Sequence, residues 1–294
     1  MKKMFMAVIA LMMTISASAQ FYIYCSDGNV IKVDSISMIA PEEAEQPNPS
    51  AGISVFSVSA DKQVTFSKGN LQYTQSTNTW SFAENQYDYL GEANIAIDAD
   101  VLADKVDLFG WSTSATNFGV STSTDYDDYY GSFVDWGTNK IGNDAPNTWR
   151  TLSYDEWLYL SWARPNYSEL CGVAQVNGVN GLIFLPDNWT CPEGITFKSG
   201  FHRNYGADYY AAYQTFTAEQ WSKLESAGAV FLPAAGYRYG TDVRDVQNYG
   251  RYWSATEDSS LSAAYSLLFR SVEAAMGNCY RYYGQSVRLV KDLQ

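Results

Sequence analysis

The sequence predicts an α+β domain with a few short strands, two helices and long irregular loops. Three observations predict this class. Short runs of β-branched and aromatic residues recur between turns rich in Gly, Asn and Asp. Two helix-start motifs interrupt these runs. Residues 110–148 are rich in Ser, Thr, Asn, Asp, Gly and Tyr and lack apolar periodicity. Strands do not alternate regularly with helices, which argues against a doubly wound sheet.

The N-terminus predicts a signal peptide over residues 1–19. Lys2 and Lys3 precede an apolar run over residues 4–15, and Ala17-Ser18-Ala19 places small residues where signal peptidase cuts. The run is too short to cross a bilayer, and no later apolar stretch reaches the roughly 20 residues that a transmembrane helix needs. A buried apolar helix is the alternative. We therefore expect an exported protein without a transmembrane span, located at the cell surface, in the periplasm or outside the cell.

Two short segments are expected before the main domain. Residues 20–40 contain β-type runs at 21–24 and 30–33 around Asp27-Gly28, which favours a β-hairpin module. Residues 41–51 carry three prolines and several acids without periodic apolar positions, as is typical of a linker. The main domain is predicted to occupy residues 52–294.

Turn residues divide the main domain into further strands. The strand predictions are residues 53–58, 64–66, 71–73, 80–82, 181–185, 230–232, 252–254, 264–269 and 286–290. In the last of these, Val287 and Leu289 alternate with Ser286 and Arg288, a pattern that indicates a half-buried strand.

Both helices are predicted from their first residues. Residues 153–156 (Ser-Tyr-Asp-Glu) form a capping box, followed by Trp157, Leu158 and Leu160, which we expect to face a core.

The second capping box, residues 217–220 (Thr-Ala-Glu-Gln), opens a segment that carries Trp221 and Leu224 toward a core. Gly228 is expected to end this helix. We also expect Trp253 to be buried in a core strand.

The acidic composition argues against nucleic acids and anionic lipid surfaces as partners. The net charge is −13 and the pI about 4.4, whereas nucleic-acid binding requires a basic face. Electrostatic docking to anionic lipid is disfavoured for the same reason. We expect no nucleic-acid partner.

The sequence argues against most catalytic machinery. His202 is the single histidine and has no neighbouring nucleophile, and neither G-x-x-x-x-G-K-[ST] nor G-x-G-x-x-G occurs. Asp125, Asp127 and Asp128 crowd one loop, but their spacing does not match an EF-hand, and a solvated loop is favoured over a calcium site. We expect no catalytic residue, metal or cofactor. A carbohydrate-active enzyme that uses an acid pair stays open as an alternative.

Four cysteines stand at 25, 171, 191 and 279 without a C-x-x-C pair, which disfavours a zinc or thioredoxin-type site. Export permits disulfides, and Cys171 with Cys191 could close a loop. The alternative is that these cysteines are small apolar residues without partners.

The region from about Trp149 to Leu289 resembles the Fibrobacter major paralogous domain, a bacterial branch of the C-type-lectin-like fold. The segments that carry the resemblance are, in order, WRTLSYDEWLYL, GLIFLPDNW, FLPAAGYRYG with GRYWSATED, and YGQSVRLVKD. The resemblance implies a C-type-lectin-like fold with two helices, a small twisted antiparallel sheet, and adjacent N- and C-terminal strands.

That fold class includes formylglycine-generating enzymes and variable binding proteins diversified by retroelements. The formylglycine-generating enzymes use a pair of cysteines near the C-terminus. In this sequence only Cys279 lies in the corresponding stretch, so the resemblance argues against that enzyme activity. Retroelement diversification stays open; a reverse transcriptase gene beside a near-copy of the C-terminal coding segment would show it. The resemblance therefore favours ligand binding.

Aromatic content indicates where binding would occur. The chain has 23 Tyr and 9 Trp, residues that offer large rigid contact area, and Tyr237 to Tyr283 mixes Tyr with Ser, Gly, Asn and Arg. We expect an exported recognition or adhesion protein of the bacterial cell envelope that binds an extracellular protein or glycan on the loops of this segment. A structural surface protein without a discrete site is the further alternative. The predicted ligand-binding residues are Tyr239, Arg244, Asn248, Arg251, Tyr280 and Tyr282.

Overall fold

The computed structural model describes residues 54–94, 96–98, 101–111, 117–259 and 262–293, together with the backbone of two strands at 21–24 and 30–33. The chain forms two compact units, residues 1–48 and 49–294. In the first unit, β1 (Phe21–Tyr24) pairs antiparallel with β2 (Val30–Val33). The predicted signal peptide and linker lie outside the described residues.

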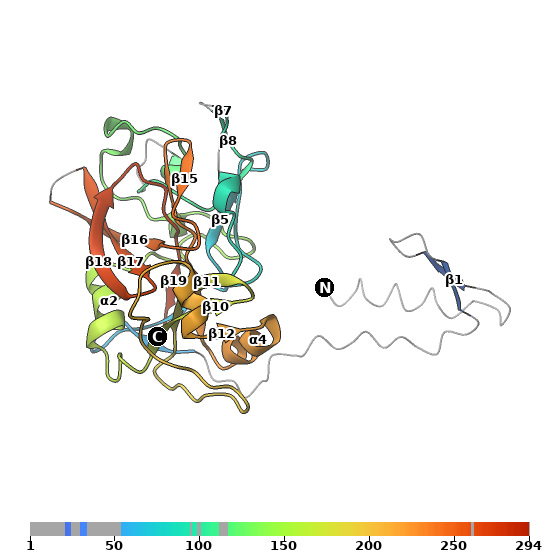
Figure 1. Cartoon of the computed structure of the whole chain (residues 1–294). Coiled ribbons are helices and arrows are strands. Elements are labelled where there is room, and N and C mark those ends of the chain that lie inside the picture. The colour runs from blue at the N-terminus through green and yellow to red at the C-terminus, as the bar shows by residue number, and fades with distance from the viewer. Residues whose placement is uncertain are drawn as a thin grey trace. The chain divides into compact units, whose positions relative to one another are not determined.

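The second unit is a mixed α+β domain with few helices and several small sheets, which confirms the predicted α+β class (Figure 1). One sheet has the order β12-β10-β11-β13, and β11 pairs antiparallel with both of its neighbours. The bounds of these strands are Cys171–Val176 for β10, Val179–Phe184 for β11, Thr215–Phe216 for β12 and Val230–Pro233 for β13.

A second sheet is an antiparallel ribbon with the order β16-β17-β18, drawn in orange and red in Figure 1. Its strands are β16 (Gly250–Glu257), β17 (Ala263–Arg270) and β18 (Glu273–Tyr280). The hairpin of β14 (Tyr237–Tyr239) and β15 (Asp242–Arg244) precedes it.

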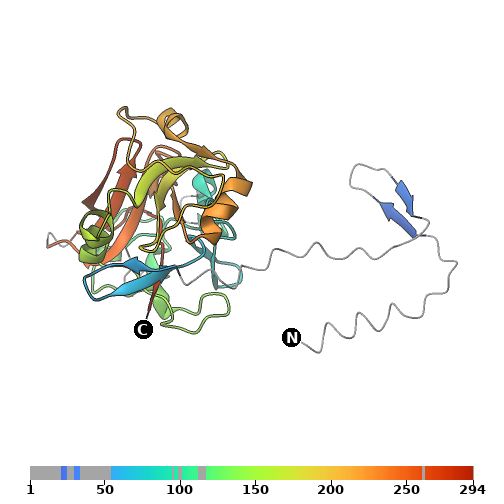
Figure 2. The ribbon, with the colours of Figure 1, turned by 90° about the horizontal axis from the view of Figure 1, so that it is seen from below.

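The two ends of the domain meet in a third sheet. Its order is β19-β4-β3, and Val290 pairs with Phe66 across the antiparallel β19–β4 contact. The view turned by 90° shows the early strands beside the C-terminus (Figure 2). The strands are β3 (Phe56–Ser57), β4 (Gln63–Phe66) and β19 (Val290–Asp292).

Two further sheets are a three-stranded one with the order β6-β5-β9 and a two-stranded one with the order β7-β8. Their strands are β5 (Leu71–Thr74), β6 (Thr79–Phe82), β7 (Ala96–Asp98), β8 (Val101–Leu102) and β9 (Lys105–Val106). The loops contain short 3₁₀ turns, which are η2 (Gly91–Asn94), η3 (Asn117–Gly119), η4 (Asp127–Tyr129) and η5 (Trp136–Thr138).

The first predicted helix begins at its capping box. The Ser153 side chain accepts from the Glu156 N–H, and the Glu156 carboxylate accepts from the Ser153 N–H. The helix α2 (Tyr154–Leu158) continues into a π-helical turn, η6 (Tyr159–Ala163). Trp157 and Leu160 are fully buried as expected, but Leu158 is 38% exposed. The expectation for Leu158 was wrong because it lies one position after Trp157, away from the buried stripe.

The second predicted helix, α4 (Ala218–Ser226), also begins with its capping box, between Thr217 and Gln220. It ends in a Schellman motif: the Gly228 N–H donates to the Glu225 carbonyl and the Ala229 N–H to the Leu224 carbonyl. Gly228 has φ +99°, which favours glycine. A further helix that the sequence analysis did not predict, α3 (Asp208–Tyr213), packs beside β10.

The C-terminal segment differs from the prediction. Residues 286–290 were expected to form a half-buried strand, yet strand β19 begins only at Val290, and Ser286, Val287, Arg288 and Leu289 are all buried. Segments lie on both sides of this stretch: Leu71 donates to the Val287 carbonyl, and Trp253 donates to the Ser286 carbonyl. The prediction from alternating polar and apolar residues was wrong because the polar residues Ser286 and Arg288 are buried as well.

Candidate functional site

Tyrosine and arginine side chains form a continuous contact network over the C-terminal strands. We call it the tyrosine–arginine network. Its members are Tyr126, Tyr205, Tyr237, Tyr239, Tyr249, Tyr280, Tyr282, Tyr283, Arg244, Arg251 and Arg270.

The β14 strand supplies one edge of this network through simple alternation. Arg238 N–H donates to the Gly284 carbonyl and Gly284 N–H donates back to Arg238, each at 2.8 Å, so β14 is held against the turn after β18. Because neighbouring side chains on a strand point to opposite faces, Tyr237 and Tyr239 reach the surface while Arg238 is fully buried.

Arg238 anchors this strand from inside. Its guanidinium donates to the carbonyls of Leu108, at 3.2 Å, and Gly240, at 3.1 Å. Burial lowers the pKa of Arg238 to about 10, still well above neutrality. The side chain therefore stays charged and is held by carbonyl dipoles.

Four of the predicted ligand-binding residues touch one another directly or through one ring. Tyr280 and Tyr282 stack with centroids 5.3 Å apart, and Tyr239 lies 5.8 Å from Tyr282. The Arg244 guanidinium lies 4.9 Å from the centroid of the Tyr239 ring. Such cation–π contacts fix long side chains at a surface.

The other two predicted residues lie further along the network. Arg251 sits 4.0 Å from the Tyr237 ring centroid and 5.4 Å from that of Tyr249. Asn248 Nδ2 donates to the Tyr205 hydroxyl at 2.6 Å, and Tyr205 lies beside Tyr249. The structure thus brings the predicted residues together as one strip.

Two expectations about these residues need correction. Tyr239, Arg244, Arg251 and Tyr280 lie within strands β14, β15, β16 and β18, not on loops. Tyr282 is only 6% exposed, whereas Tyr280 is 44% exposed. Tyr282 therefore supports the exposed rings from below and offers little contact area itself.

Two phenols of the network, those of Tyr282 and Tyr283, remain neutral. Burial raises the pKa of Tyr282, and neighbouring Tyr126 raises it further. Burial also raises the pKa of Tyr283. Since an ordinary tyrosine pKa is already about 10, these two phenols keep their protons near neutral pH and do not act as bases.

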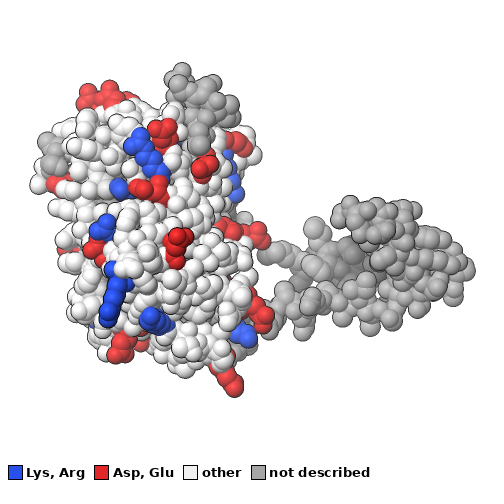
Figure 3. Space-filling view, in the orientation of Figure 1, with Lys and Arg blue, Asp and Glu red and all other residues white. Residues whose placement is uncertain are grey.

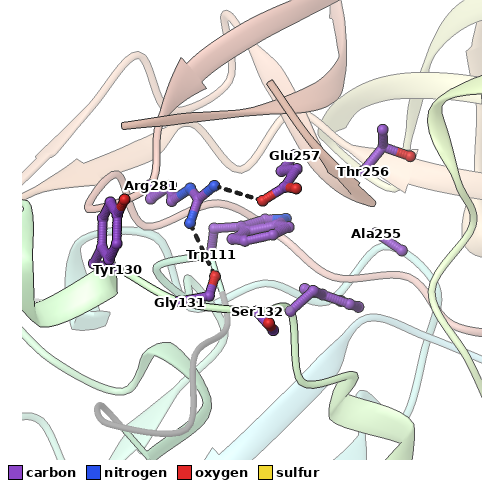
Figure 4. Close-up of a pocket in the computed structure, with 9 residues that line it drawn as sticks. Trp111, Tyr130, Gly131, Ser132, Ala255, Thr256, Glu257 and Arg281 are labelled. Carbon is purple, nitrogen blue, oxygen red and sulfur yellow. Dashed lines mark hydrogen bonds and ion pairs between the residues drawn. The ribbon is translucent and has the colours of Figure 1, made fainter. Parts of the chain in front are cut away.

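A pocket of about 520 Å³ opens beside the network and was missed by the sequence analysis (Figure 4). It is lined by Trp111, Tyr130, Gly131, Ser132, Phe133, Ala255, Thr256, Glu257 and Arg281.

Arg281 is the central polar group of the pocket. Its side chain is only 4% exposed, its guanidinium lies 4.4 Å from the Trp111 ring centroid, and Nη2 donates to Glu257 at 3.1 Å. Nη1 donates to the Gly131 carbonyl at 3.1 Å, as the dashed lines in Figure 4 show. The only sequence signal for this site was an arginine between tyrosines at residues 280–283.

The acidic loop considered for calcium is organised by its own hydrogen bonds. Asp127 N–H donates to the Asp125 carboxylate at 3.1 Å, and the Tyr129 hydroxyl donates to the Ser123 carbonyl at 3.0 Å. Within the described part of the chain, no group of three or more His, Cys, Asp or Glu side chains is placed to hold a metal ion.

The remaining chemical candidates are the single histidine and the cysteines. His202 stacks on Tyr209 with centroids 4.6 Å apart and accepts from the Asn204 N–H. Cys171, Cys191 and Cys279 are free thiols, so the disulfide between Cys171 and Cys191 is not formed. Burial raises the pKa of Cys171 to about 12, which leaves it protonated and unreactive. Cys25 lies outside the described residues.

The surface charge is mixed. On the face shown in Figure 3, basic and acidic side chains are interspersed and most of the surface is uncharged. Among the described residues, we find no helix with the length and apolar character to cross a membrane.

A comparison with protein-family models matches part of the chain. The sequence model of a family described as a domain of unknown function (DUF8237) matches residues 212–290. No curated protein and no solved structure matches the chain. The matched region runs from the end of α3 to the start of β19 and contains every predicted ligand-binding residue.

Proposed function

We propose that the protein is an exported ligand-binding protein of the bacterial cell envelope, which recognises an extracellular protein or glycan through the tyrosine–arginine network. The observation that carries the proposal is the exposure of this network at both ends. Tyr126 and Tyr280 are each 44% exposed at one end, and Tyr205 is 47% exposed at the other. Exposed aromatic side chains that belong to one contact network are typical of an interaction site.

The rigidity of the strip supports recognition over a purely structural surface. Arg251 is held between Tyr237 and Tyr249, and Arg270 lies 5.2 Å from the Tyr205 ring centroid. Side chains that are already ordered lose little conformational entropy when a ligand binds. Tyrosine and arginine are also the residue types that contribute most to interface affinity.

The proposal extends to a C-type-lectin-like fold related to the Fibrobacter major paralogous domain. The pairing of β19 with β4 supports it, because that fold places its terminal strands side by side. The capped helices α2 and α4 and the small antiparallel sheets agree with it as well.

The test is a binding screen of the purified protein on glycan and protein arrays, followed by Tyr239→Ala and Tyr280→Ala. We expect both variants to lose binding of the ligand found while unfolding at the wild-type temperature. Tyr167→Ala is the matched control, because Tyr167 is 39% exposed but lies outside the network. Wild-type binding by both network variants would refute the assignment.

A further inference from the structure

We infer that the pocket around Arg281 is a subsite for an uncharged saccharide, whose neighbouring hydroxyl groups bind the Arg281–Glu257 pair. The inference rests on the proposed ligand-binding function and names the class of ligand. It places the recognition of hydroxyl groups beside the tyrosine–arginine network, since Arg281 directly follows Tyr280 and precedes Tyr282.

The pair presents a fixed donor beside an accessible acceptor. Four partners orient the Arg281 guanidinium: the carbonyls of Gly131 at 3.1 Å, Ala263 at 3.3 Å and Tyr129 at 3.5 Å, and the Trp111 ring below it. Glu257 is bonded to Arg281 through Oε2 at 3.1 Å, yet its side chain is 61% exposed. A ligand can therefore reach the carboxylate while the guanidinium stays in place.

A sugar hydroxyl matches this arrangement because it donates and accepts at the same time. One hydroxyl of a neighbouring pair can donate to Glu257 while the other accepts from Arg281. Both hydrogen bonds are charge-assisted and therefore stronger than bonds between neutral groups. The ion pair itself need not break for the sugar to bind.

The walls of the pocket suit the rest of a sugar ring. Two of the residues that line the pocket are aromatic side chains with exposed surface: Tyr130 is 57% exposed, and Phe133 is half-buried. Their rings can cover the apolar C–H face of a pyranose, while Ser132 and Thr256 add hydroxyl groups. The volume of about 520 Å³ falls in the range of about 300–1,000 Å³ typical of small-molecule sites.

The charged side chains in and near the pocket disfavour ionised ligands. Glu257 already neutralises Arg281, so a ligand carboxylate would have to displace it. Asp125 and Asp127 are exposed in the loop that leads to Tyr130 and would repel an acidic sugar. A basic ligand would instead compete with Arg281 for Glu257.

The experiment is calorimetric titration of the purified protein with uncharged oligosaccharides of glucose, galactose, mannose and xylose, and with oligouronates as charged counterparts. We expect an uncharged oligosaccharide to bind, and Glu257→Gln and Arg281→Lys each to weaken that binding about tenfold or more, the usual effect of losing a charge-assisted hydrogen bond. Glu219→Gln is the matched control, since Glu219 is an exposed carboxylate on α4. It should bind like the wild type.

Other outcomes overturn the inference in distinguishable ways. Tighter oligouronate binding by Glu257→Gln would show that Arg281 takes an acidic ligand. If uncharged oligosaccharides bind both pocket variants normally but fail to bind Tyr280→Ala, the pocket assignment is wrong and the proposed function stands. Binding of array proteins without any oligosaccharide would likewise overturn the pocket assignment alone, and no binding on any array contradicts both. Should Arg281→Lys not fold, Glu257→Gln decides alone, because that exposed side chain can change without disturbing the loop.

Discussion

Arg150 and Asp292 lie 142 residues apart in the chain, yet Nη2 of Arg150 donates to the Asp292 carboxylate at 2.6 Å. The same guanidinium donates to both oxygens of Glu156, in the first turn of α2. One arginine thereby ties the last strand of the domain to its first main helix. Lys62 adds a second cation to the same carboxylates.

We expect Arg150→Met to lower the free energy of unfolding by about 2 kcal/mol at neutral pH, because it leaves two carboxylates short of their charged donor. Urea unfolding measures this change. Lys223→Met is the control: Lys223 forms an exposed ion pair with Glu219 on α4, so its loss should cost less than about 0.5 kcal/mol. Equal costs for the two variants would contradict the role of Arg150.

The same contact predicts acid sensitivity. Burial alone would raise the pKa of Glu156, but hydrogen bonds from Arg150 and Ser153 outweigh it and hold the pKa below its usual value. Hydrogen bonds from Arg150 also lower the pKa of Asp292. Their contribution is therefore complete above the unfolded-state pKa of about 4 and is lost as the pH falls through the folded-state values. The difference in stability between wild type and Arg150→Met should shrink below pH 4.

Acidification should stabilise the folded domain through Asp107, which is the opposite of the effect expected for Glu156 and Asp292. It is fully buried, and burial raises its pKa to about 6 despite hydrogen bonds from the Asn94 side chain and the Leu90 N–H. Because the folded-state pKa lies above the unfolded one, its contribution to unfolding free energy rises as the pH falls from 7 toward 4. Carboxyl-carbon NMR should show titration near pH 6, and this signal should vanish in Asp107→Asn. A midpoint near 4 would contradict the effect of burial.

Trp157 and Trp221 test the packing of the two capped helices. Trp157 lies among Phe66 and Phe184, and Trp221 packs 5.5 Å from Phe231 by ring centroids. Truncation of either to Ala should cost about 3–5 kcal/mol, measured by urea unfolding. Leu158→Ala is the control on the same helix as Trp157, since its side chain is exposed; a cost as large as that of Trp157→Ala would mean that the buried face is misassigned.

Local signals predicted much of the fold. The capping boxes at Ser153 and Thr217 depend on contacts within one helical turn, so sequence was sufficient to place both helix starts. Strand β18 was missed because its residues, Glu-Ala-Ala-Met-Gly-Asn-Cys-Tyr, have weak β-propensity and are held by pairing with β17. The burial of Arg288 could not be inferred either, because its partners Gln86 and Phe231 come from distant segments.

One part of the candidate site could likewise be predicted from local sequence, and another part could not. The tyrosines between residues 237 and 283 were conspicuous by composition, and the strand pairs bring them together. The pocket was not predictable, since Trp111, Glu257 and Arg281 meet only through tertiary folding. Tyr282 could not be placed correctly from the sequence. Composition indicates that a tyrosine can provide contact area, but it does not indicate whether the ring is exposed or buried.

Export predicts a defined mature N-terminus. Ala17-Ser18-Ala19 fits the requirement of signal peptidase for small residues, so the mature protein should begin at Gln20. Mass spectrometry of the protein recovered from the cell envelope or medium measures this directly. Ala19→Arg should block cleavage and leave a larger, unprocessed chain. Recovery of a cytoplasmic product that retains residues 1–19 in the wild type would contradict export.

Tyr280 and Tyr282 stack on each other but should contribute differently. Tyr282 is buried and also contacts Tyr126, Tyr239 and Tyr283, with ring centroids 5.1–5.8 Å away. Its truncation to Ala removes the support beneath these rings and should lower stability by about 3 kcal/mol. Tyr280 lies at the surface, so Tyr280→Ala should leave stability within about 0.5 kcal/mol of the wild type.

Phenylalanine variants separate packing from the hydroxyl group. Tyr282→Phe keeps the ring and should retain both stability and binding of the ligand identified on the arrays, because the neutral phenol acts through its face. Tyr280→Phe should retain most of the binding that Tyr280→Ala loses. Thermal unfolding and titration of the four variants measure both effects. Loss of binding in Tyr282→Phe at full stability would mean that this hydroxyl group contacts the ligand, and the buried ring would then have to become accessible when the ligand binds.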